Sequence, residues 1–368
     1  MGELPYFVEL EQALDICKRT TLQTVVERVG LDDCHNRILA MDLPSKVDDP
    51  PFDNSAMDGF AMRYEDTTAA PSKLEIIGTI QAAGQEDNIF IKPGQAVRIM
   101  TGAPLPKGAD SILQVELTST EAGFVTLQQP SIKHFIRKKG ENLTKGEVAL
   151  SAGAFLTPSR VGLCATMGHS SIPVIKRLKI AIISTGDELK QPGQKLERGE
   201  IYESNSFGIS GLVKWLGHEP TRLHCVGDTL DDLRKTLNSA AKEYDLILTN
   251  GGVSMGEWDL VRKIMEDEGD LHFWRVKLRP GSPPLFGTWN NTPIFGLPGN
   301  PVSSHVVFRM LVAPWIRNAT MANGPHEPRA TAKLATKVKS TKDCLTLRRV
   351  SIESGKDGLF AHQKIHQG

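Results

Sequence analysis

The sequence has few cysteines, and none of them stands in a redox or metal-binding motif. Its five cysteines form no CxxC pair, and their odd number does not suit a framework of disulfides. The ten histidines are scattered, without the spacing that metal ligands show. We therefore expect small buried thiols in a reduced compartment, and neither a disulfide scaffold nor a zinc or iron site.

The sequence also lacks net charge and long apolar runs. Basic and acidic residues both number 43 in the 368-residue chain, which argues against nucleic acid or an anionic membrane as the main partner. The first residues, MGELPYFVELEQAL, do not have the basic and apolar segments of a signal peptide. No apolar run approaches the length of a membrane span. We expect a cytoplasmic protein of roughly two to four domains.

The first half of the chain mixes helical and β patterns. Apolar residues at helical spacing predict a helix over residues 8–19, and a second helical stretch is predicted near 24–29. From 47 to 139, short β-rich runs broken by Gly and Pro predict a small β-rich module. Residues 145–173 return to a helical pattern, in which Pro158 suits the first helical position.

From residue 177 onward, predicted strands alternate with predicted helices. The runs LKIAIIS, TRLHCV, DLILT and TPIFGL read as strands, and most of their residues are apolar. Helices are predicted over 205–216, 229–244 and 257–268, and Asn300 suits the cap of another. This alternation predicts an α/β layer with a mainly parallel sheet. After Pro325 the pattern changes to alternating β segments.

Three of these strands end in Gly-rich, polar loops, namely STGDEL, TNGGVSMGEWD and GLPGNPVSS. In an open parallel sheet, ligands bind beyond the carboxyl ends of the strands, and glycine lets a ligand approach the backbone. A tight turn is the alternative reading of any single loop, but three together favour a binding site. No P-loop or GxGxxG is present, which disfavours an ordinary ATPase or dinucleotide enzyme. The polar side chains at this edge are Thr185, Asp187, Glu188, Ser254, Asp259, Asn300 and Ser303.

The run FWRVKLRPGSPPLFG carries three basic residues with a period of two. This spacing predicts that Arg275, Lys277 and Arg279 lie on one side of a strand. They form either a solvated edge or, beside the Gly-rich loops, a site for phosphate or another oxyanion. In the second case, nearby carboxylates would bind Mg²⁺ between the protein and the phosphate oxygens.

The segment DNSAMDG, residues 53–59, follows a Pro-Pro pair and places two carboxylates five residues apart. Its carboxylates, amide and hydroxyl surround a single methionine. The segment is too polar for a core strand and too specific in sequence for an ordinary surface turn. We expect it to contribute to a functional site.

Seven motifs together resemble those of the molybdopterin molybdenumtransferase family, in order and spacing: DNSAMDG, MTGAPLPKGAD, RKKGEN, STGDEL, TNGGVSMGEWD, RPGSP and GLPGNPVS. The resemblance covers nearly the whole chain. It implies an enzyme that converts adenylyl-molybdopterin and molybdate into molybdenum cofactor and AMP, assisted by Mg²⁺. It also implies a homodimer whose cleft lies between the α/β domain of one subunit and the DNSAMDG module of the other. Molybdopterin adenylyltransferase and molybdoenzyme acceptors are the protein partners that it implies.

The resemblance further implies a division into four parts. Residues 1–46 and 140–176 would form a helical dimerisation and linker region, and residues 47–139 the β-rich module that carries DNSAMDG. Residues 177–325 would form the α/β molybdopterin-binding domain. Residues 326–368 would be part of a truncated C-terminal β domain.

The functional residues of the family carry over to the matching positions of this chain. Asp58 is implied as a cross-subunit carboxylate aimed at the metal and the pyrophosphate. Arg279 and Ser303 are implied to bind the anion. The implied catalytic residues are Asp58, Thr101, Glu188, Asp228 and Asp259, and all of these except Thr101 are also the implied metal ligands. The implied substrate-binding residues are Arg137, Thr185, Gly186, Asp187, Gly251, Gly252, Ser254, Lys277, Arg279, Pro298, Gly299, Asn300, Ser303 and Arg349.

Two motifs depart from the family pattern. KPGKP reads RPGSP here, so that Ser282 replaces a lysine, and GED reads GEN, so that Asn142 replaces an aspartate. Two further functions stay open beside the enzyme, and these departures motivate the second. One is a dimeric scaffold of the gephyrin type that binds receptor peptides. The other is a catalytically weakened protein that binds adenylyl-molybdopterin but inserts the metal poorly.

Overall fold

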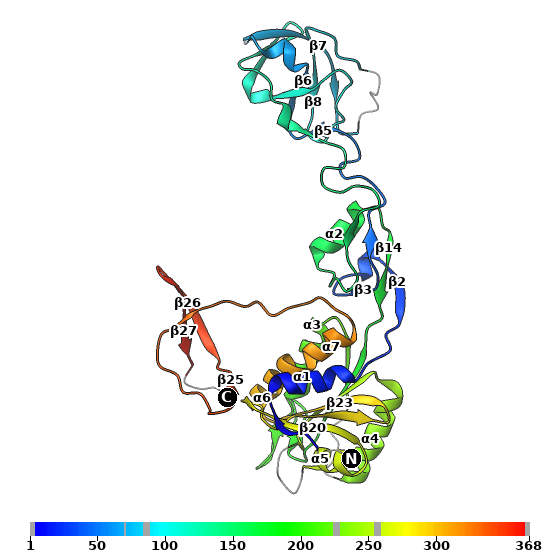
Figure 1. Ribbon diagram of the computed structural model, residues 1–368, viewed down its shortest axis with the longest axis vertical. Coiled ribbons are helices and arrows are strands. Elements are labelled where there is room, and N and C mark those ends of the chain that lie inside the picture. The colour runs from blue at the N-terminus through cyan, green and yellow to red at the C-terminus, as the bar shows by residue number, and fades with distance from the viewer. Residues whose placement is uncertain (1–3, 70, 84–88, 224–228, 254–258, 365–368) are drawn as a thin grey trace. The chain divides into compact units, whose positions relative to one another are not determined.

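The computed structural model describes residues 4–69, 71–83, 89–223, 229–253 and 259–364 (Figure 1). Contacts within the chain define two compact units. Residues 42–151 and 158–171 form one, called here the β unit, and the rest of the chain forms the α/β unit. Among the described residues, no helix is both long and apolar enough to cross a membrane.

A seven-stranded sheet organises the α/β unit, in the order β1-β20-β22-β23-β19-β15-β18. Four of the six neighbouring strand pairs are parallel, and both antiparallel pairs involve β22. The sheet is therefore mixed, with a parallel portion that contains β23, β19, β15 and β18. Its strands are β1 (Tyr6–Val8), β15 (Lys179–Ser184), β18 (Glu219–Arg222), β19 (Leu246–Asn250), β20 (Asp270–Val276), β22 (Leu285–Trp289) and β23 (Thr292–Leu297).

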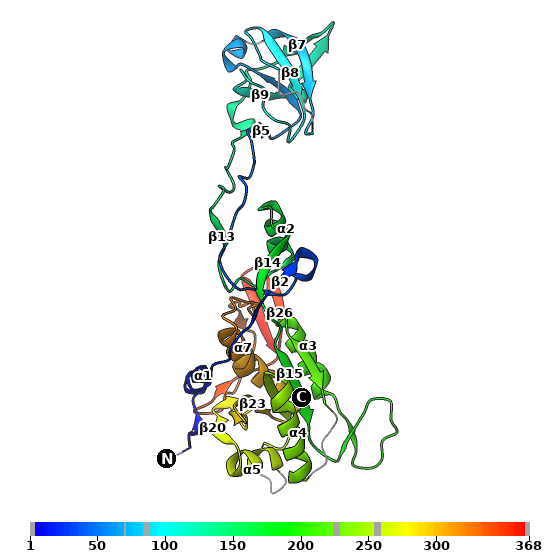
Figure 2. The same ribbon diagram turned by 90° about the vertical axis from the view of Figure 1, so that its right-hand side faces the viewer.

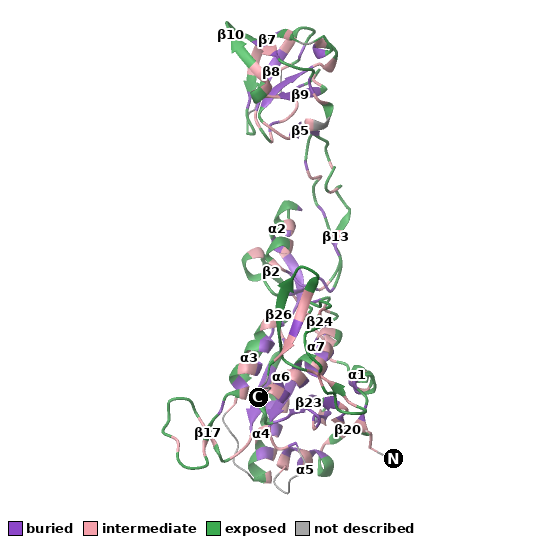
Figure 3. Cartoon of the chain, turned by 90° about the vertical axis from the view of Figure 1, so that its left-hand side faces the viewer, coloured by how far each residue is buried: buried purple, intermediate pink, exposed green. Residues whose placement is uncertain are grey.

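Helices cover both faces of this sheet. The alternation of strand side chains sends Ile180 and Ile182 to one core and Ala181 and Ile183 to the other. The first core packs against α1 (Leu10–Arg19), α3 (Asn205–Trp215), α6 (Pro301–Val307) and α7 (Ala313–Ala319), and the second against α4 (Leu230–Glu243) and α5 (Leu260–Asp267). Figures 1 and 2 show α1 and α7 on one side of the sheet and α4 and α5 on the other. Burial on both faces explains why the central strands read as continuous apolar runs, as the colouring of β23 in Figure 3 illustrates.

The predicted caps fix two of these helices. The Thr229 hydroxyl accepts a hydrogen bond from the backbone N–H of Asp232 at 3.2 Å, and α4 begins at the next residue. The Asn300 side chain accepts from the backbone N–H of Ser303 at 3.1 Å, with Pro301 at the start of α6. Both caps confirm the predictions made for them.

Three sequence predictions fail locally. The stretch near residues 24–29 is not helical, because Val26–Gly30 forms β2 in a small sheet with β14 (Ser171–Ile175) and β3 (Ile38–Leu39). Its β-branched residues suit a strand once a partner strand lies beside it. Within 145–173, only Pro158–Thr166 is helical (α2), since Val148–Leu150 and Ser171–Ile175 form strands. Of the predicted strand TRLHCV, residues 224–226 lie outside the described residues.

The third failure concerns the three basic residues with a period of two. Arg275 has a φ of +69°, and β20 ends at the following residue, so the alternation of side chains is interrupted. The Arg275 guanidinium donates to the Tyr6 hydroxyl at 2.7 Å, and the Lys277 ammonium pairs with Glu9 at 2.6 Å. Arg279 follows in a separate short strand, β21 (Leu278–Arg279). The three side chains therefore do not form one basic face.

The segment after Pro325 adds strands to the α/β unit. β25 (Leu345–Thr346) runs parallel to β21, with Arg279 opposite Thr346. Leu347 packs against the first core of the sheet. Three further strands form a small sheet: β24 (Lys333–Leu334), β26 (Val350–Gly355) and β27 (Gly358–Gln363).

The β unit is built on a six-stranded sheet in the order β10-β11-β7-β8-β6-β9. Within DNSAMDG, Asn54 and Ser55 form β5, and β6 starts at Gly59. A Cβ at Gly59 would lie 2.1 Å from the carbonyl oxygen of Leu113, so only glycine allows β9 to pass this closely. The strands of the sheet are β6 (Gly59–Met62), β7 (Ser72–Ile80), β8 (Gln95–Ile99), β9 (Ser111–Gln114), β10 (Thr118–Glu121) and β11 (Phe124–Leu127).

None of the four described cysteines forms a disulfide, in agreement with the sequence prediction. Cys17, Cys34 and Cys164 are buried, and Cys344 is partly exposed. Burial raises the pKa of the Cys17 thiol, which keeps it protonated and unreactive. The fifth cysteine, Cys225, lies outside the described residues.

Candidate active site

A cavity of about 890 Å³ opens at the carboxyl ends of β15, β19 and β23. These strands are neighbours in the sheet, so their three loops meet at one edge, as the rule for open α/β sheets requires. The segment from Arg279 to Pro283, Thr341 and residues 346–348 complete the lining. All of these residues belong to the α/β unit.

Two glycines bring the loops into close contact. Gly251 has a φ of +94°, and a Cβ there would lie 3.0 Å from the carbonyl oxygen of Thr185. Gly186 has a φ of +135°, and a Cβ there would lie 2.4 Å from a carboxylate oxygen of Glu188. Glycine at position 251 thus allows the loop after β19 to contact the loop after β15. Glycine at position 186 allows the Glu188 carboxylate to pack against the backbone of its own loop.

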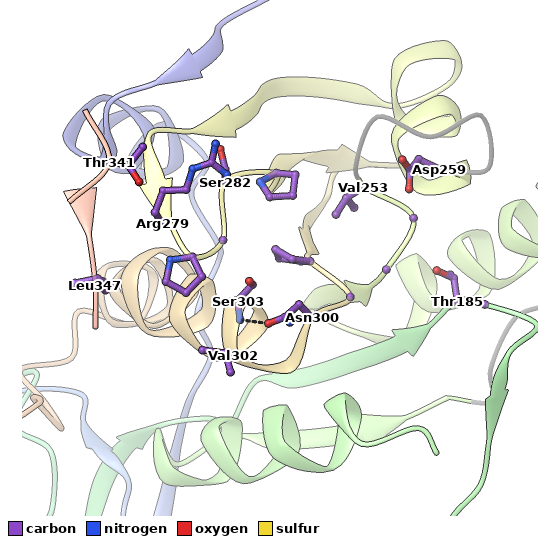
Figure 4. Close-up of a pocket in the computed structure, with 18 of the residues that line it drawn as sticks. Thr185, Val253, Asp259, Arg279, Ser282, Asn300, Val302, Ser303, Thr341 and Leu347 are labelled. Carbon is purple, nitrogen blue, oxygen red and sulfur yellow. Dashed lines mark hydrogen bonds between the residues drawn. The ribbon is translucent and has the colours of Figure 1, made fainter. Parts of the chain in front are cut away.

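The polar groups of the cavity are separated by charge. Figure 4 shows Arg279 and Thr341 at one end, Thr185 and Asp259 at the other, and Asn300 and Ser303 between them. Arg348 also lines the cavity, and so does Glu188. A ligand with a tetrahedral oxyanion could bind at the Arg279 end, and the carboxylates Asp259 and Glu188 could hold a cation.

Ser282, where the family resemblance implies a lysine, forms part of the wall of this cavity. Ser282 is only 1% exposed, and its hydroxyl donates to the carbonyl oxygen of Val276 at 3.2 Å. The Ser282 side chain therefore hydrogen-bonds to the neighbouring backbone and adds no charge to the cavity. Arg279 and Arg348 are the cations that remain in the lining.

The predicted site residues of the α/β unit fall into three groups. Asp187, Lys277 and Arg349 are described but do not line the cavity. Asp228 and Ser254 lie outside the described residues. The predicted residues that line the cavity are Thr185, Gly186, Glu188, Gly251, Gly252, Asp259, Arg279, Pro298, Gly299, Asn300 and Ser303.

The remaining predicted residues, Asp58, Thr101 and Arg137, belong to the β unit. The Asp58 carboxylate accepts two hydrogen bonds from Thr101, and Arg137 lies opposite Asn54 in the pair of strands β12 (Ile136–Arg137) and β5. Asp53 accepts from the Lys138 ammonium at 2.7 Å, which lowers the pKa of its carboxyl. The two aspartates of DNSAMDG therefore differ: Asp53 binds the basic loop, whereas Asp58 is exposed directly before the start of β6.

The cavity offers carboxylate oxygens that suit Mg²⁺, but the described residues alone do not supply a complete set of ligands for the ion. Among the residues that the structure describes, no three His, Cys, Asp or Glu side chains gather closely enough to hold a metal ion. Glu188 and Asp259 provide oxygen ligands in the same cavity. Mg²⁺ in enzymes commonly uses one or two carboxylates together with phosphate oxygens of the substrate.

Sequence reasoning missed four residues near the C-terminus that line the cavity: Thr341, Thr346, Leu347 and Arg348. The signal that could have pointed to them is the short run LTLRR, whose first two residues form β25. The register of β25 against β21 brings Thr346 opposite Arg279. The resemblance implied Arg349, one position further along.

Comparisons with known proteins cover nearly the whole chain. Residues 8–168 match the family described as the MoeA N-terminal region (domain I and II), and residues 181–318 match a probable molybdopterin binding domain. The molybdopterin molybdenumtransferase of Haemophilus influenzae is 39% identical over 80% of this chain and 72% of its own. Molybdopterin molybdenumtransferase 2 of Mycobacterium tuberculosis is 36% identical over 88% of this chain and 83% of its own.

A solved structure agrees with these sequence matches. The crystal structure of a molybdopterin biosynthesis MoeA protein from Pyrococcus horikoshii superposes with a TM-score of 0.81 and 28% identity. The alignment covers 98% of this chain and 91% of that one. With both domain families matched in order and relatives above one-third identity over most of its length, the chain belongs to the molybdopterin molybdenumtransferase family.

Proposed function

We propose that the protein inserts molybdenum from molybdate into adenylyl-molybdopterin and releases AMP, forming molybdenum cofactor. The observation that carries this proposal is the cavity at the carboxyl ends of three neighbouring strands, with Arg279 at one end and Asp259 at the other, and with Arg348 and Glu188 also in its lining. Molybdate and the adenylated phosphate are both anionic. The Arg279 end of the cavity suits an anion, and the Asp259 end suits a cation.

In this proposal, the basic and hydroxyl residues of the cavity bind the oxyanion and the acidic residues bind the metal. Arg279 and Arg348 bind the oxyanion through charge-assisted hydrogen bonds, and the Ser303 hydroxyl adds a neutral donor. Glu188 and Asp259 would hold Mg²⁺, and the bound ion would neutralise phosphate charge. Cleavage of a phosphoanhydride depends on such neutralisation more than on a protein nucleophile.

We further propose that the protein acts as a homodimer, with residues 1–46 and 140–176 in its dimerisation region. Asp58, Thr101 and Arg137 belong to a different compact unit from the cavity. In a homodimer, the Asp58 of one subunit would act at the cavity of the other. The substrate would come from an adenylyltransferase, and the product would pass to molybdoenzymes in the cytoplasm.

The direct test measures AMP released from adenylyl-molybdopterin, with and without molybdate and Mg²⁺. We expect AMP release that depends on molybdate, together with active cofactor detected by reconstitution of an apo-molybdoenzyme. Arg279→Ala removes a cation from the cavity, and Lys277→Ala is the matched control because Lys277 pairs with Glu9 outside it. Tight binding without turnover would contradict the proposal and favour a scaffold or a weakened enzyme.

A complementation experiment tests the shared cleft. Asp58→Ala and Arg279→Ala homodimers are each expected to be nearly inactive. Mixed dimers contain one cleft with both residues intact if Asp58 acts across subunits, so mixing the two variants should restore activity. Mixtures that exchange subunits and stay inactive would show that Asp58 does not act in the partner's cleft.

A further inference from the structure

A second cavity of about 440 Å³ lies in the α/β unit, at the small sheet of β2, β14 and β3 (Figure 1). It opens where a 3₁₀ turn, η1 (Leu31–Asp33), follows β2. Among the described residues, none lines both this cavity and the candidate active site. We call it the second cavity, and its lining residues are Val29, Asp32, Asp33, His35, Arg37 and Arg177.

Arg37 is a buried cation in the wall of the second cavity. It is only 6% exposed, and its Nη2 donates to the carbonyl oxygen of Ile175 at 3.0 Å and to the Glu27 carboxylate. Its Nε is buried and has no acceptor among the described residues. A buried donor left without an acceptor costs about 1–3 kcal/mol. The hydrogen bonds within the chain therefore do not fully satisfy this guanidinium, which makes it a candidate to bind a ligand.

Arg177 adds a second guanidinium to the lining. Its Nη1 donates to the carbonyl oxygen of Gly217, and its Nη2 donates to the carbonyl oxygen of His35 at 3.3 Å, so contacts with the backbone orient the side chain. Burial, and then the charge of Arg37, lowers the pKa of Arg177. The second cause indicates that the two guanidiniums are close enough to repel each other. A carboxylate bound to both would offset this repulsion through charge-assisted hydrogen bonds.

Two carboxylates also belong to the lining of the second cavity. Asp32 and Asp33 are exposed and lie in η1. Their charges disfavour a dianion such as phosphate, because both carboxylates would repel it. A ligand with one carboxylate and one ammonium group avoids this conflict, since its carboxylate can contact the arginines while its ammonium group contacts the aspartates. The charges of the lining therefore complement a small zwitterion.

We propose that the second cavity binds a free amino acid in its zwitterionic form. The carboxylate of the ligand accepts from the guanidiniums of Arg37 and Arg177, whose planar shape suits a carboxylate. The ammonium group of the ligand donates to the carboxylates of η1. The cavity volume of about 440 Å³ leaves room for a side chain on the ligand. This proposal is independent of the proposed function, because it uses none of the residues that line the candidate active site.

The direct test is isothermal titration calorimetry of the full chain with five small probes: glycine, γ-aminobutyrate, acetate, methylammonium and inorganic phosphate. Glycine and γ-aminobutyrate carry the same two charges at different separations, whereas acetate and methylammonium carry one charge each. We expect at least one of the two amino acids to bind about tenfold or more tightly than acetate and methylammonium, because it gains hydrogen bonds to charged groups at both ends. Phosphate binding more tightly than both amino acids, or no binding of either amino acid, would overturn the proposal.

Variants connect the binding to the named residues and predict opposite effects on different probes. The double variant Asp32→Asn/Asp33→Asn should weaken binding of the amino acid, whose ammonium group loses its partners. The same variant should strengthen binding of acetate, because two repelling charges are removed. Arg177→Gln should raise the Kd of both ligands about tenfold or more. Lys176→Gln is the matched control, since it removes a cation from the neighbouring, exposed position outside the cavity.

Arg177 is partly buried and bonded to the backbone, so circular dichroism and thermal melts must show that its variant folds. The double aspartate variant provides a second route, because both side chains are exposed and outside the hydrophobic core. Unchanged affinity for the amino acid in the folded double variant would overturn the proposal, whatever the result for Arg177→Gln. Weaker binding of both the amino acid and acetate in the double variant would also overturn it, since the aspartates would then not act through their charge.

Discussion

The Asp58 carboxylate receives two hydrogen bonds from one residue, Thr101, whose backbone N–H and hydroxyl both lie 2.7 Å from Asp58 Oδ1. The backbone bond and then the hydroxyl bond are the main causes that lower the pKa of Asp58, and the charge of Arg98 lowers it further. The carboxylate is exposed and yet ionised and fixed in direction. These are the properties that a group acting on a metal or a phosphate in another subunit needs.

Removal of the Asp58 charge should slow the reaction. We expect Asp58→Asn to lower the rate of AMP release by a factor that corresponds to about 2.7–4 kcal/mol of lost transition-state stabilisation. Asp53→Asn is the matched control, because Asp53 belongs to the same motif but binds Lys138 and Lys139. Equal rates for Asp58→Asn and the wild type, at normal dimer content, would refute this role.

The hydroxyl of Thr101 should control the acid limb of the pH–rate profile. A carboxyl whose pKa is lowered by folding stays ionised until the pH falls below that lowered value. Thr101→Val keeps the backbone bond to Asp58 but removes the hydroxyl bond, so the pKa should rise and activity should be lost at a higher pH. The limb lies at or below the ordinary aspartate pKa of 3.8, so rates of AMP release between about pH 2.5 and about pH 5 measure the displacement, and superimposable profiles would contradict it.

Arg348, which lines the cavity, should matter more for molybdate than Arg349. Arg348 also donates to the carbonyl oxygen of Lys339 at 2.7 Å, which orients its guanidinium. A hydrogen bond to a charged group contributes about 1.5–3 kcal/mol, so Arg348→Ala should raise the molybdate concentration for half-maximal rate about tenfold or more. Arg349→Ala should have a smaller effect. The reverse order would favour the residue that the family resemblance implied.

The Asn300 cap should stabilise the fold independently of catalysis. Asn300→Ala removes the acceptor for the Ser303 N–H and should lower the free energy of unfolding by about 1 kcal/mol. Asn300→Ser retains a capping oxygen and should recover most of this loss. Urea denaturation followed by circular dichroism gives both values. Equal stability of the alanine and serine variants would show that the cap does not stabilise α6.

His218 should make stability depend on pH. Burial, assisted by the charges of Arg177 and Arg37, lowers the pKa of His218 from 6.5 to about 4. Between these values the unfolded chain binds a proton that the folded chain does not, so the free energy of unfolding falls as the pH falls through this window. The full effect is about 3 kcal/mol, and it is absent above about pH 6.5.

The measurement compares urea denaturation of the wild type and His218→Gln at about pH 7 and about pH 4. The stability advantage of the wild type should shrink at the lower pH, because only the wild type has this histidine. The glutamine side chain keeps an acceptor near the Leu178 N–H, which donates to the His218 Nδ1 at 3.2 Å in the wild type. The same difference in stability at both pH values would contradict the assignment.

Local sequence determined much of the α/β unit. Runs of apolar residues formed β15, β19 and β23 because strands covered by helices on both faces must be apolar throughout. Thr229 and Asn300 fixed the starts of helices because a cap needs only residues within one turn. The meeting of the three Gly-rich loops was also predictable, since the carboxyl ends of parallel strands share an edge.

Only the tertiary structure decided which basic residues line the cavity. Arg279 lines it and Lys277 pairs with Glu9 near the N-terminus, although the two are separated by a single residue. The positive φ of Arg275 breaks the alternation that the sequence suggested. Arg348 reaches the cavity because β25 pairs with β21 in one register. A register shift of one residue turns every side chain to the other face, and contacts between residues far apart in the sequence set that register.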